Sequence, residues 1–208
     1  GGGGGRGGGE ADALDYGHVL AAVCHTLCSF AESPAARQAM LASGAGVDTA
    51  RVLVCKLPQW VSAGHWHTSA LELSSRALFA VAQEDAGAVL LLRAGGLGAL
   101  LHVLCACTHT CDISLKDGHP EALSWVLKTL HRLYAWLSTR PQSHTVADAQ
   151  SRARHGADSG VEEVVEAAVE IAVRNVRAFV GLVTMRPQLA VLVGSILFHA
   201  SRLEGRGE

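Results

Sequence analysis

Apolar side chains recur along much of the chain at the spacing of an α-helix. Within residues 120–137 they advance by four, three, four and three positions, through Leu123, Leu127, Leu130, Tyr134 and Leu137. A second stripe has nearly the same spacing and runs through Val161, Val165, Ala168, Ala172, Phe179 and Leu182. Residues three and four apart lie on one face of a helix. Because no segment shows the alternation that marks a half-buried strand, the pattern predicts an all-α fold.

Polar and glycine-rich segments divide the helical part. Residues 1–14 form a low-complexity, Gly-rich tail, which we expect to be disordered because polyglycine has no side chains to bury. Residues 138–160 are polar without an apolar period and predict a flexible linker loop, and residues 204–208 predict a second tail. Residues 15–137 and 161–203 are expected to hold the helices, the second segment as a helical hairpin or a further repeat.

The helical part contains internal repeats. LCSFAES from Leu27 aligns with LFAVAQE from Leu78, LYAWLST from Leu133 and FVGLVTM from Phe179, at separations of 51, 55 and 46 residues. After the first two of these, SPAARQAMLASGAG and EDAGAVLLLRAGG also align. Both predict a short helix, a glycine break and a second apolar helix, because glycine permits a sharp turn between packed helices.

This pattern resembles the armadillo repeat family, or its looser HEAT relatives, most closely over Ser69–Cys105. The resemblance implies a right-handed α-solenoid of about three to four irregular units. The separations exceed the family period of about 40–47 residues. An insertion at residues 56–67 would account for part of the excess, and an irregular helical bundle is the alternative fold.

The resemblance also implies a function and a set of site residues. Stacked repeats form a concave surface that binds protein segments, and peptide-binding armadillo members carry Trp and, four residues later, Asn on their third helices. The Trp positions here hold His25, Arg76, His131 and Arg177, and the Asn positions hold Ser29, Ala80, Ala135 and Gly181. We therefore expect a non-enzymatic interaction scaffold that binds an acidic partner segment rather than a basic one. The alternative is that these residues form the solvated face of amphipathic helices.

The insertion is a second candidate contact surface. It carries Trp60 and Trp66, and Trp is enriched at protein-binding hot spots. The alternative is burial of both indole rings under the adjacent helices.

The segment CACTHTC places Cys105, Cys107, His109 and Cys111 within seven positions. Side chains two positions apart on a helix point in different directions, so this spacing closes on a metal ion only in a loop. The preceding helix is expected to end at about Cys107, and buried cysteines behave as small hydrophobes. No metal site is therefore predicted. A metal- or redox-responsive helical domain that uses Cys105–Cys111 remains an alternative function.

Composition and charge disfavour several other classes. Charged residues make up 17% of the chain and the formal net charge is −2, whereas nucleic-acid binders have a basic balance. An organellar RNA-binding helical-repeat protein is therefore the less favoured alternative. No uninterrupted apolar run has the roughly 18 residues of a membrane span. Without recognisable catalytic motifs, we expect no enzyme and no cofactor.

Two further expectations concern the cellular context. None of the six cysteines forms a CxxC pair, and this indicates a reduced, intracellular protein, with the cytoplasm as the expected compartment. Because the sequence begins with Gly1 rather than Met, we expect it to be part of a larger protein.

Overall fold

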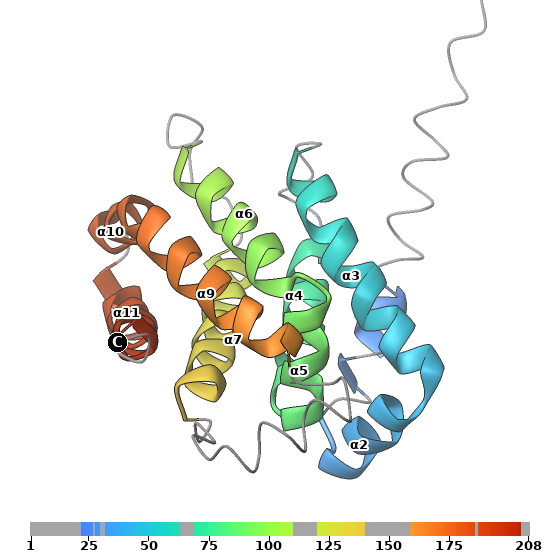
Figure 1. Cartoon of the computed structure of the whole chain (residues 1–208). Coiled ribbons are helices and arrows are strands. Elements are labelled where there is room, and N and C mark those ends of the chain that lie inside the picture. Colours follow the sequence, from blue (N-terminus) through green and yellow to red (C-terminus); the bar gives the residue numbers. More distant parts are fainter. Residues whose placement is uncertain are drawn as a thin grey trace, which may run out of the picture.

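The computed structural model describes residues 22–26, 28–29, 32–62, 69–109, 120–139, 159–185 and 187–204. Within these residues every regular element is a helix, so the all-α prediction is confirmed (Figure 1). The predicted tail at residues 1–14 and residues 140–158 of the predicted linker lie outside the described residues.

The helices follow one another through short connections. They are α2 (Pro34–Ala42), α3 (Gly44–Ser62), α4 (Ser69–Ala82), α5 (Asp85–Arg93), α6 (Gly96–His109), α7 (Pro120–Thr139), α9 (Ser159–Arg174), α10 (Val176–Met185) and α11 (Ala190–Glu204), with the 3-10 turn η1 (Pro187–Leu189) before α11. Residues 22–26 and 28–29, before α2, are also helical. The helix α7 includes Ser138 and Thr139, the first two residues of the predicted linker.

The two predicted glycine breaks are present where the short helices end. In the first turn of α3, just after the break from α2, an added Cβ on Gly46 would lie 2.0 Å from the carbonyl oxygen of Met40. Between α5 and α6, Gly95 has a φ of +80°, a conformation that side chains disfavour. A Cβ on the next residue, Gly96, would lie 2.7 Å from the carbonyl oxygen of Leu91. Glycine is therefore needed at both breaks, and the predicted order of short helix, break and second helix is confirmed.

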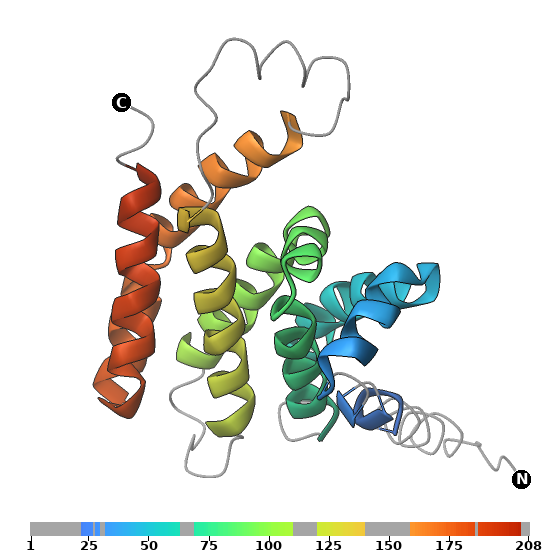
Figure 2. The ribbon, with the colours of Figure 1, turned by 90° about the horizontal axis from the view of Figure 1, so that it is seen from below.

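Helices far apart in the sequence pack side by side. Figure 2 shows α4, α7 and α11 in one row, with α7 in contact with both neighbours. Behind this row α3 packs against α6, and α6 packs against α10. Arg76 of α4 lies beside Trp125 of α7. Seven residues further along each segment, Gln83 lies beside Arg132. The helices α4 and α7 therefore run parallel.

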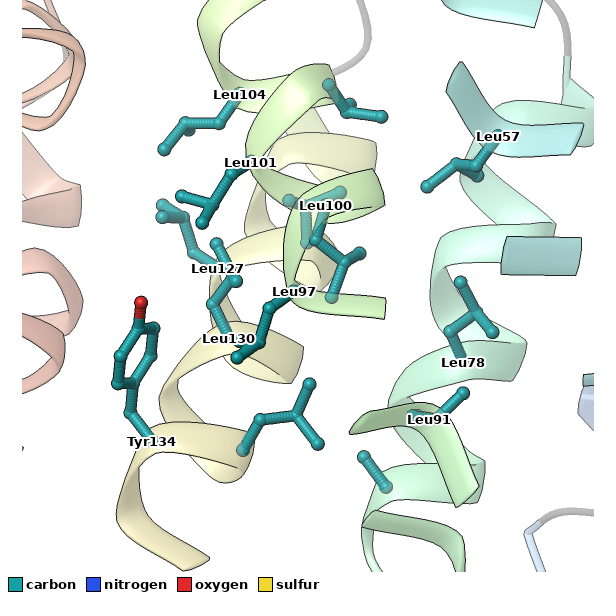
Figure 3. Packing of buried hydrophobic residues seen from close by; sticks show 14 of the residues in the cluster. Leu57, Leu78, Leu91, Leu97, Leu100, Leu101, Leu104, Leu127, Leu130 and Tyr134 are labelled. Atoms are coloured by element: carbon teal, nitrogen blue, oxygen red, sulfur yellow. The ribbon is translucent and has the colours of Figure 1, made fainter. Parts of the chain in front are cut away.

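The core lies between these two sets of helices. Figure 3 shows Leu97, Leu100 and Leu101 of α6 packed toward Leu127 and Leu130 of α7. All five residues of the α7 stripe are buried, as their spacing predicts, and so are Ala168, Ala172, Phe179 and Leu182. Each fully buried leucine or aromatic side chain contributes about 1.5–3 kcal/mol of hydrophobic free energy.

Within the described residues, no single helix is both long and apolar enough to cross a membrane. The helix α5 and the first part of α6, to Ala106, have the required length and composition only when taken together, and they are bent by 74° relative to each other.

Candidate partner-binding face

Two neighbouring helices present a continuous stripe of exposed and half-exposed side chains. We call this stripe the α4–α7 face and define it by Arg76, Phe79 and Ala80 of α4, by Gln83 in the turn that follows α4, and by Trp125, Lys128 and Arg132 of α7. Counted from Arg76 or from Trp125, the other members follow at three, four or seven positions, so those of each segment lie on one side. On α7 this side is opposite the buried leucine stripe, which explains why the helix presents these residues outward.

The half-buried indole of Trp125 is the centre of the α4–α7 face. The ring centroid of Phe79 lies 5.3 Å from the indole centroid, at an interplanar angle of 41°. The ammonium group of Lys128 lies 4.0 Å from the indole centroid and the guanidinium carbon of Arg76 lies 5.9 Å from it. Both cations are within the distance at which an aromatic ring attracts positive charge. The face thus combines a large apolar surface with two cations.

Two arginines on this face make equivalent ion pairs, each with a carboxylate near the start of the helix two helices earlier. Arg76 Nη2 donates to Glu32, 2.7 Å away, and Glu32 stands just before α2. Arg132 Nη2 donates to Asp85, 2.8 Å away, and Asp85 is the first residue of α5. By its contacts, Arg132 is therefore the counterpart of Arg76, one position beyond the His131 that the sequence alignment placed there.

These ion pairs orient the arginines more than they stabilise the fold. The side chains of Glu32 and Asp85 are 66% and 77% exposed, so solvent screens both pairs, and each contributes at most about 1 kcal/mol. The two guanidinium charges are also partly compensated. Among the described residues no carboxylate lies within ion-pairing distance of Lys128, which makes it the cation of the face that is open to a partner's acid.

The four residues predicted at the Trp positions of the repeats do not form one row. His25 is exposed on the helical segment before α2, and this segment contacts α4, since Cys28 Sγ donates to Leu73 O at 3.3 Å. His131 lies on α7 but its ring stands 5.6 Å from that of His199 on α11. Arg177 lies on α10, which packs against α6, α9 and α11, whereas the helix beside α7 is α11. Of the four residues, Arg76 is the one that belongs to the α4–α7 face.

The environment of His131 disfavours its charged form. Burial, and secondly the charge of Arg132, hold the pKa of His131 below its usual value. His131 therefore contributes less positive charge to the face than an exposed histidine would.

The insertion residues cannot be placed on a surface. Trp60 belongs to α3, but its side chain and the whole of Trp66 lie outside the described residues.

Trp125, Phe79, Lys128 and Arg132 were not singled out from the sequence. The sequence does carry a pattern that points to three of them. Trp125 lies on the polar side of α7, opposite the leucine stripe, with Lys128 three residues later and Arg132 four residues after Lys128. That pattern indicates an aromatic residue held at the surface by amphipathic helix geometry.

A surface depression of about 610 Å³ adjoins the α4–α7 face. It lies between α2 and the start of α5 and is lined by Gln38, Leu41, Ala42, Gln83, Glu84, Asp85 and Ala86. Arg37 Nε donates to Glu84 at 2.9 Å and so joins α2 to the opposite wall. Because Gln83 and Asp85 also contact Arg132, the depression continues the face rather than forming a separate site.

The described part of the Cys105–Cys111 segment is helical. The helix α6 continues to His109, two residues beyond the expected end. Cys105 Sγ donates to Asn175 Oδ1 at 2.6 Å, and burial raises the pKa of this thiol. The side chains of Cys107 and His109 and the whole of Cys111 lie outside the described residues. Within the described residues, no three His, Cys, Asp or Glu side chains are placed to hold a metal ion.

Comparison of this chain with protein-family models, with curated proteins and with solved structures finds no match.

Proposed function

We propose that this chain is a non-enzymatic protein–protein interaction scaffold, an armadillo-like right-handed α-solenoid that holds a partner segment on the α4–α7 face. The order of the helices supports this proposal. Two successive units, α2–α3–α4 and α5–α6–α7, each consist of a short helix followed by two longer ones. The helices α9, α10 and α11 form a third, less regular unit.

The observation that carries the proposal is the regular sequence separation of the long-range side-chain hydrogen bonds within residues 28–132, which hold the first two units and the helical segment before them. The five hydrogen bonds concerned span 44 to 49 residues: Arg76 to Glu32 (44), Cys28 to Leu73 (45), Arg37 to Glu84 (47), Arg132 to Asp85 (47) and Arg132 to Gln83 (49). These separations are near the armadillo and HEAT period of about 40–47 residues. Stacking of equivalent helices at a fixed period is what defines a solenoid.

The chemistry of the α4–α7 face favours an acidic partner segment with an apolar anchor. A partner carboxylate can pair with Lys128, and an apolar side chain can pack on Trp125 and Phe79. Ala80 and Gly181 are half-buried, and an added Cβ on Gly181 would meet no atom within 4 Å. Ala80 lies on the face itself, where its small side chain fills little of the surface. Aromatic residues flanked by cations are typical anchors of protein interfaces.

The test is affinity capture from lysate with quantitative mass spectrometry. A Trp125→Ala, Lys128→Glu variant is compared with the wild type and with an Arg51→Glu control, in which an exposed residue of α3 changes charge instead. Truncating an anchor Trp costs about 2 kcal/mol or more of binding free energy, which is about a 30-fold loss. We expect partners shared by the wild type and the control to be lost from the variant, with equal helicity by circular dichroism. Equal capture by all three proteins would contradict the proposal.

A further inference from the structure

Two histidines meet at the contact between α7 and α11. The ring centroids of His131 and His199 lie 5.6 Å apart, and both side chains are half-buried. His199 Nδ1 also lies 2.7 Å from the hydroxyl oxygen of the buried Ser138. The proposed partner-binding face does not use these residues, and α7 contacts α11 extensively.

The hydroxyl of Ser138 determines which nitrogen of His199 can take up a proton. Ser138 Oγ donates its hydrogen to Ala135 O at 3.0 Å, so its oxygen is left to accept from Nδ1–H of His199. Neutral His199 then carries its lone pair on Nε2. Protonation there makes an imidazolium next to the ring of His131.

The charges around this histidine pair are cationic. Arg132 follows His131 on α7, and Arg202 lies one turn after His199 on α11; both disfavour a further positive charge. Arg132 is partly compensated by Asp85 of α5. No described carboxylate contributes to the pKa of either histidine.

In their described part, the other elements packed against the two helices place no carboxylate where it affects the pKa of either histidine. On α9, Glu170 pairs with Arg174 on the exposed side of its own helix. On α4, Arg76 pairs with Glu32, and Arg177 of α10 is exposed. The turn η1 carries no charged residue.

We propose that the His131–His199 pair makes the contact between α7 and α11 sensitive to pH, so that acidification loosens α11. Neutral rings pack together across the contact. When both are protonated, two imidazolium ions stand close together beside two guanidinium groups, and their repulsion favours separation of the helices.

The sign follows from the environment of each ring. Burial lowers the pKa of both histidines below 6.5, and the charge of His131 lowers that of His199 further. The state in which α11 has separated from α7 therefore binds more protons than the packed state once the pH falls below 6.5. The contact is fully stable above that value and weakens as the pH falls from 6.5 through the lowered pKa values. For each unit by which packing lowers the pKa of a histidine, protonation at low pH increases the equilibrium constant for separation of α11 by up to about tenfold.

The test is amide hydrogen exchange of the whole chain between about pH 7.5 and pH 5, corrected for the intrinsic pH dependence of exchange. We expect protection of α11 in the wild type to fall by about tenfold or more relative to α3. A His131→Gln, His199→Gln variant should keep its protection at pH 5, because Gln is neutral and its amide can still donate to Ser138 Oγ. His25→Gln, an exposed position away from the pair, should behave as the wild type does.

Either of two results would overturn the proposal: constant protection of α11 in the wild type, or an equal loss in the double variant. A pH titration of the imidazole proton resonances by NMR tests the proposal a second time, on the wild type alone. Both histidines should titrate below pH 6.5, and titration of either above that value would also overturn the proposal.

Discussion

One nitrogen of Arg132, Nη2, contacts both Asp85 Oδ1 at 2.8 Å and the carbonyl oxygen of Gln83 at 3.2 Å. A residue of α7 thereby holds the junction between α4 and α5, the point at which one unit ends and the next begins. Arg76 makes the same kind of contact with Glu32, just before α2. The same contact occurs in both units, and this equivalence, rather than the small energy of each ion pair, shows that the two units correspond.

The partly buried ion pair between units should be energetically coupled, unlike an exposed pair within one helix. Arg37 and Glu84 are 15% and 22% exposed and 2.9 Å apart, whereas Arg51 and Asp48 are 64% and 76% exposed and 3.9 Å apart. Double-mutant cycles to Ala, read by urea denaturation, should give a coupling of about 1–2 kcal/mol for Arg37–Glu84. The Arg51–Asp48 cycle should give about 0–0.5 kcal/mol. Equal couplings would show that the pair between units does not join α2 to α5.

Tyr134→Phe should destabilise the protein by about 1–2 kcal/mol. The ring is fully buried and its hydroxyl donates to Ala168 O at 2.8 Å, joining α7 to α9. The substitution keeps the ring but removes the donor, so the loss reports on that hydrogen bond. Thr139→Val is the control, because its exposed hydroxyl bonds within α7 and its removal should change stability by less than about 0.5 kcal/mol. The prediction is wrong if the urea midpoints of the two variants coincide.

Gly87→Ala and Gly98→Ala should change stability in opposite directions. A Cβ on Gly87 would lie 1.9 Å from the carbonyl oxygen of Val81, so α4 and α5 must move apart, at a cost of about 2–3 kcal/mol. Gly98 lies inside α6 and its Cβ would meet no atom within 4 Å, so alanine should stabilise the helix by about 0.5–1 kcal/mol. Thermal unfolding measures both, and a neutral Gly87→Ala would show that the approach of α4 to α5 is not close.

The native protein should be alkylated at Cys55 long before Cys24. Cys55 is exposed on α3, whereas Cys24 is fully buried, and burial, followed by the neighbouring Cys28, raises its pKa to about 11. Each unit of pKa lowers the reactive thiolate fraction about tenfold near neutral pH.

Mass spectrometry after timed treatment with iodoacetamide at about pH 7.5 resolves the two cysteines. Raising the pH should accelerate labelling at Cys24, and full unfolding in denaturant should bring its rate close to that of Cys55. Equal rates in the native protein would contradict the burial of the Cys24 thiol.

Much of the local structure was predictable from the chain itself. The spacing of Leu123, Leu127 and Leu130 predicted the buried side of α7, and the aligned segments predicted the glycine breaks after α2 and α5. Both signals are local: a helix repeats every 3.6 residues, and a sharp turn between packed helices excludes a Cβ.

The candidate site was predictable only in part. Arg76 was identified, but Trp125 and Lys128 were not, because alignment of repeats selects equivalent positions and does not identify which neighbours meet across two helices. A shift of one residue turns a side chain by about 100° around the helix. That rotation separates Arg132, which faces Asp85, from His131, which faces His199.

The sequence by itself determined that the chain forms amphipathic helices, which of their sides are apolar and where glycine must break them, because these properties depend on residues a few positions apart. Only the tertiary structure decided that α11 rather than α10 lies beside α7, and that Arg132 rather than His131 is the counterpart of Arg76. These relationships join residues 44 or more positions apart. They depend on how the buried surfaces of whole helices fit together, and no spacing within a single helix records that fit.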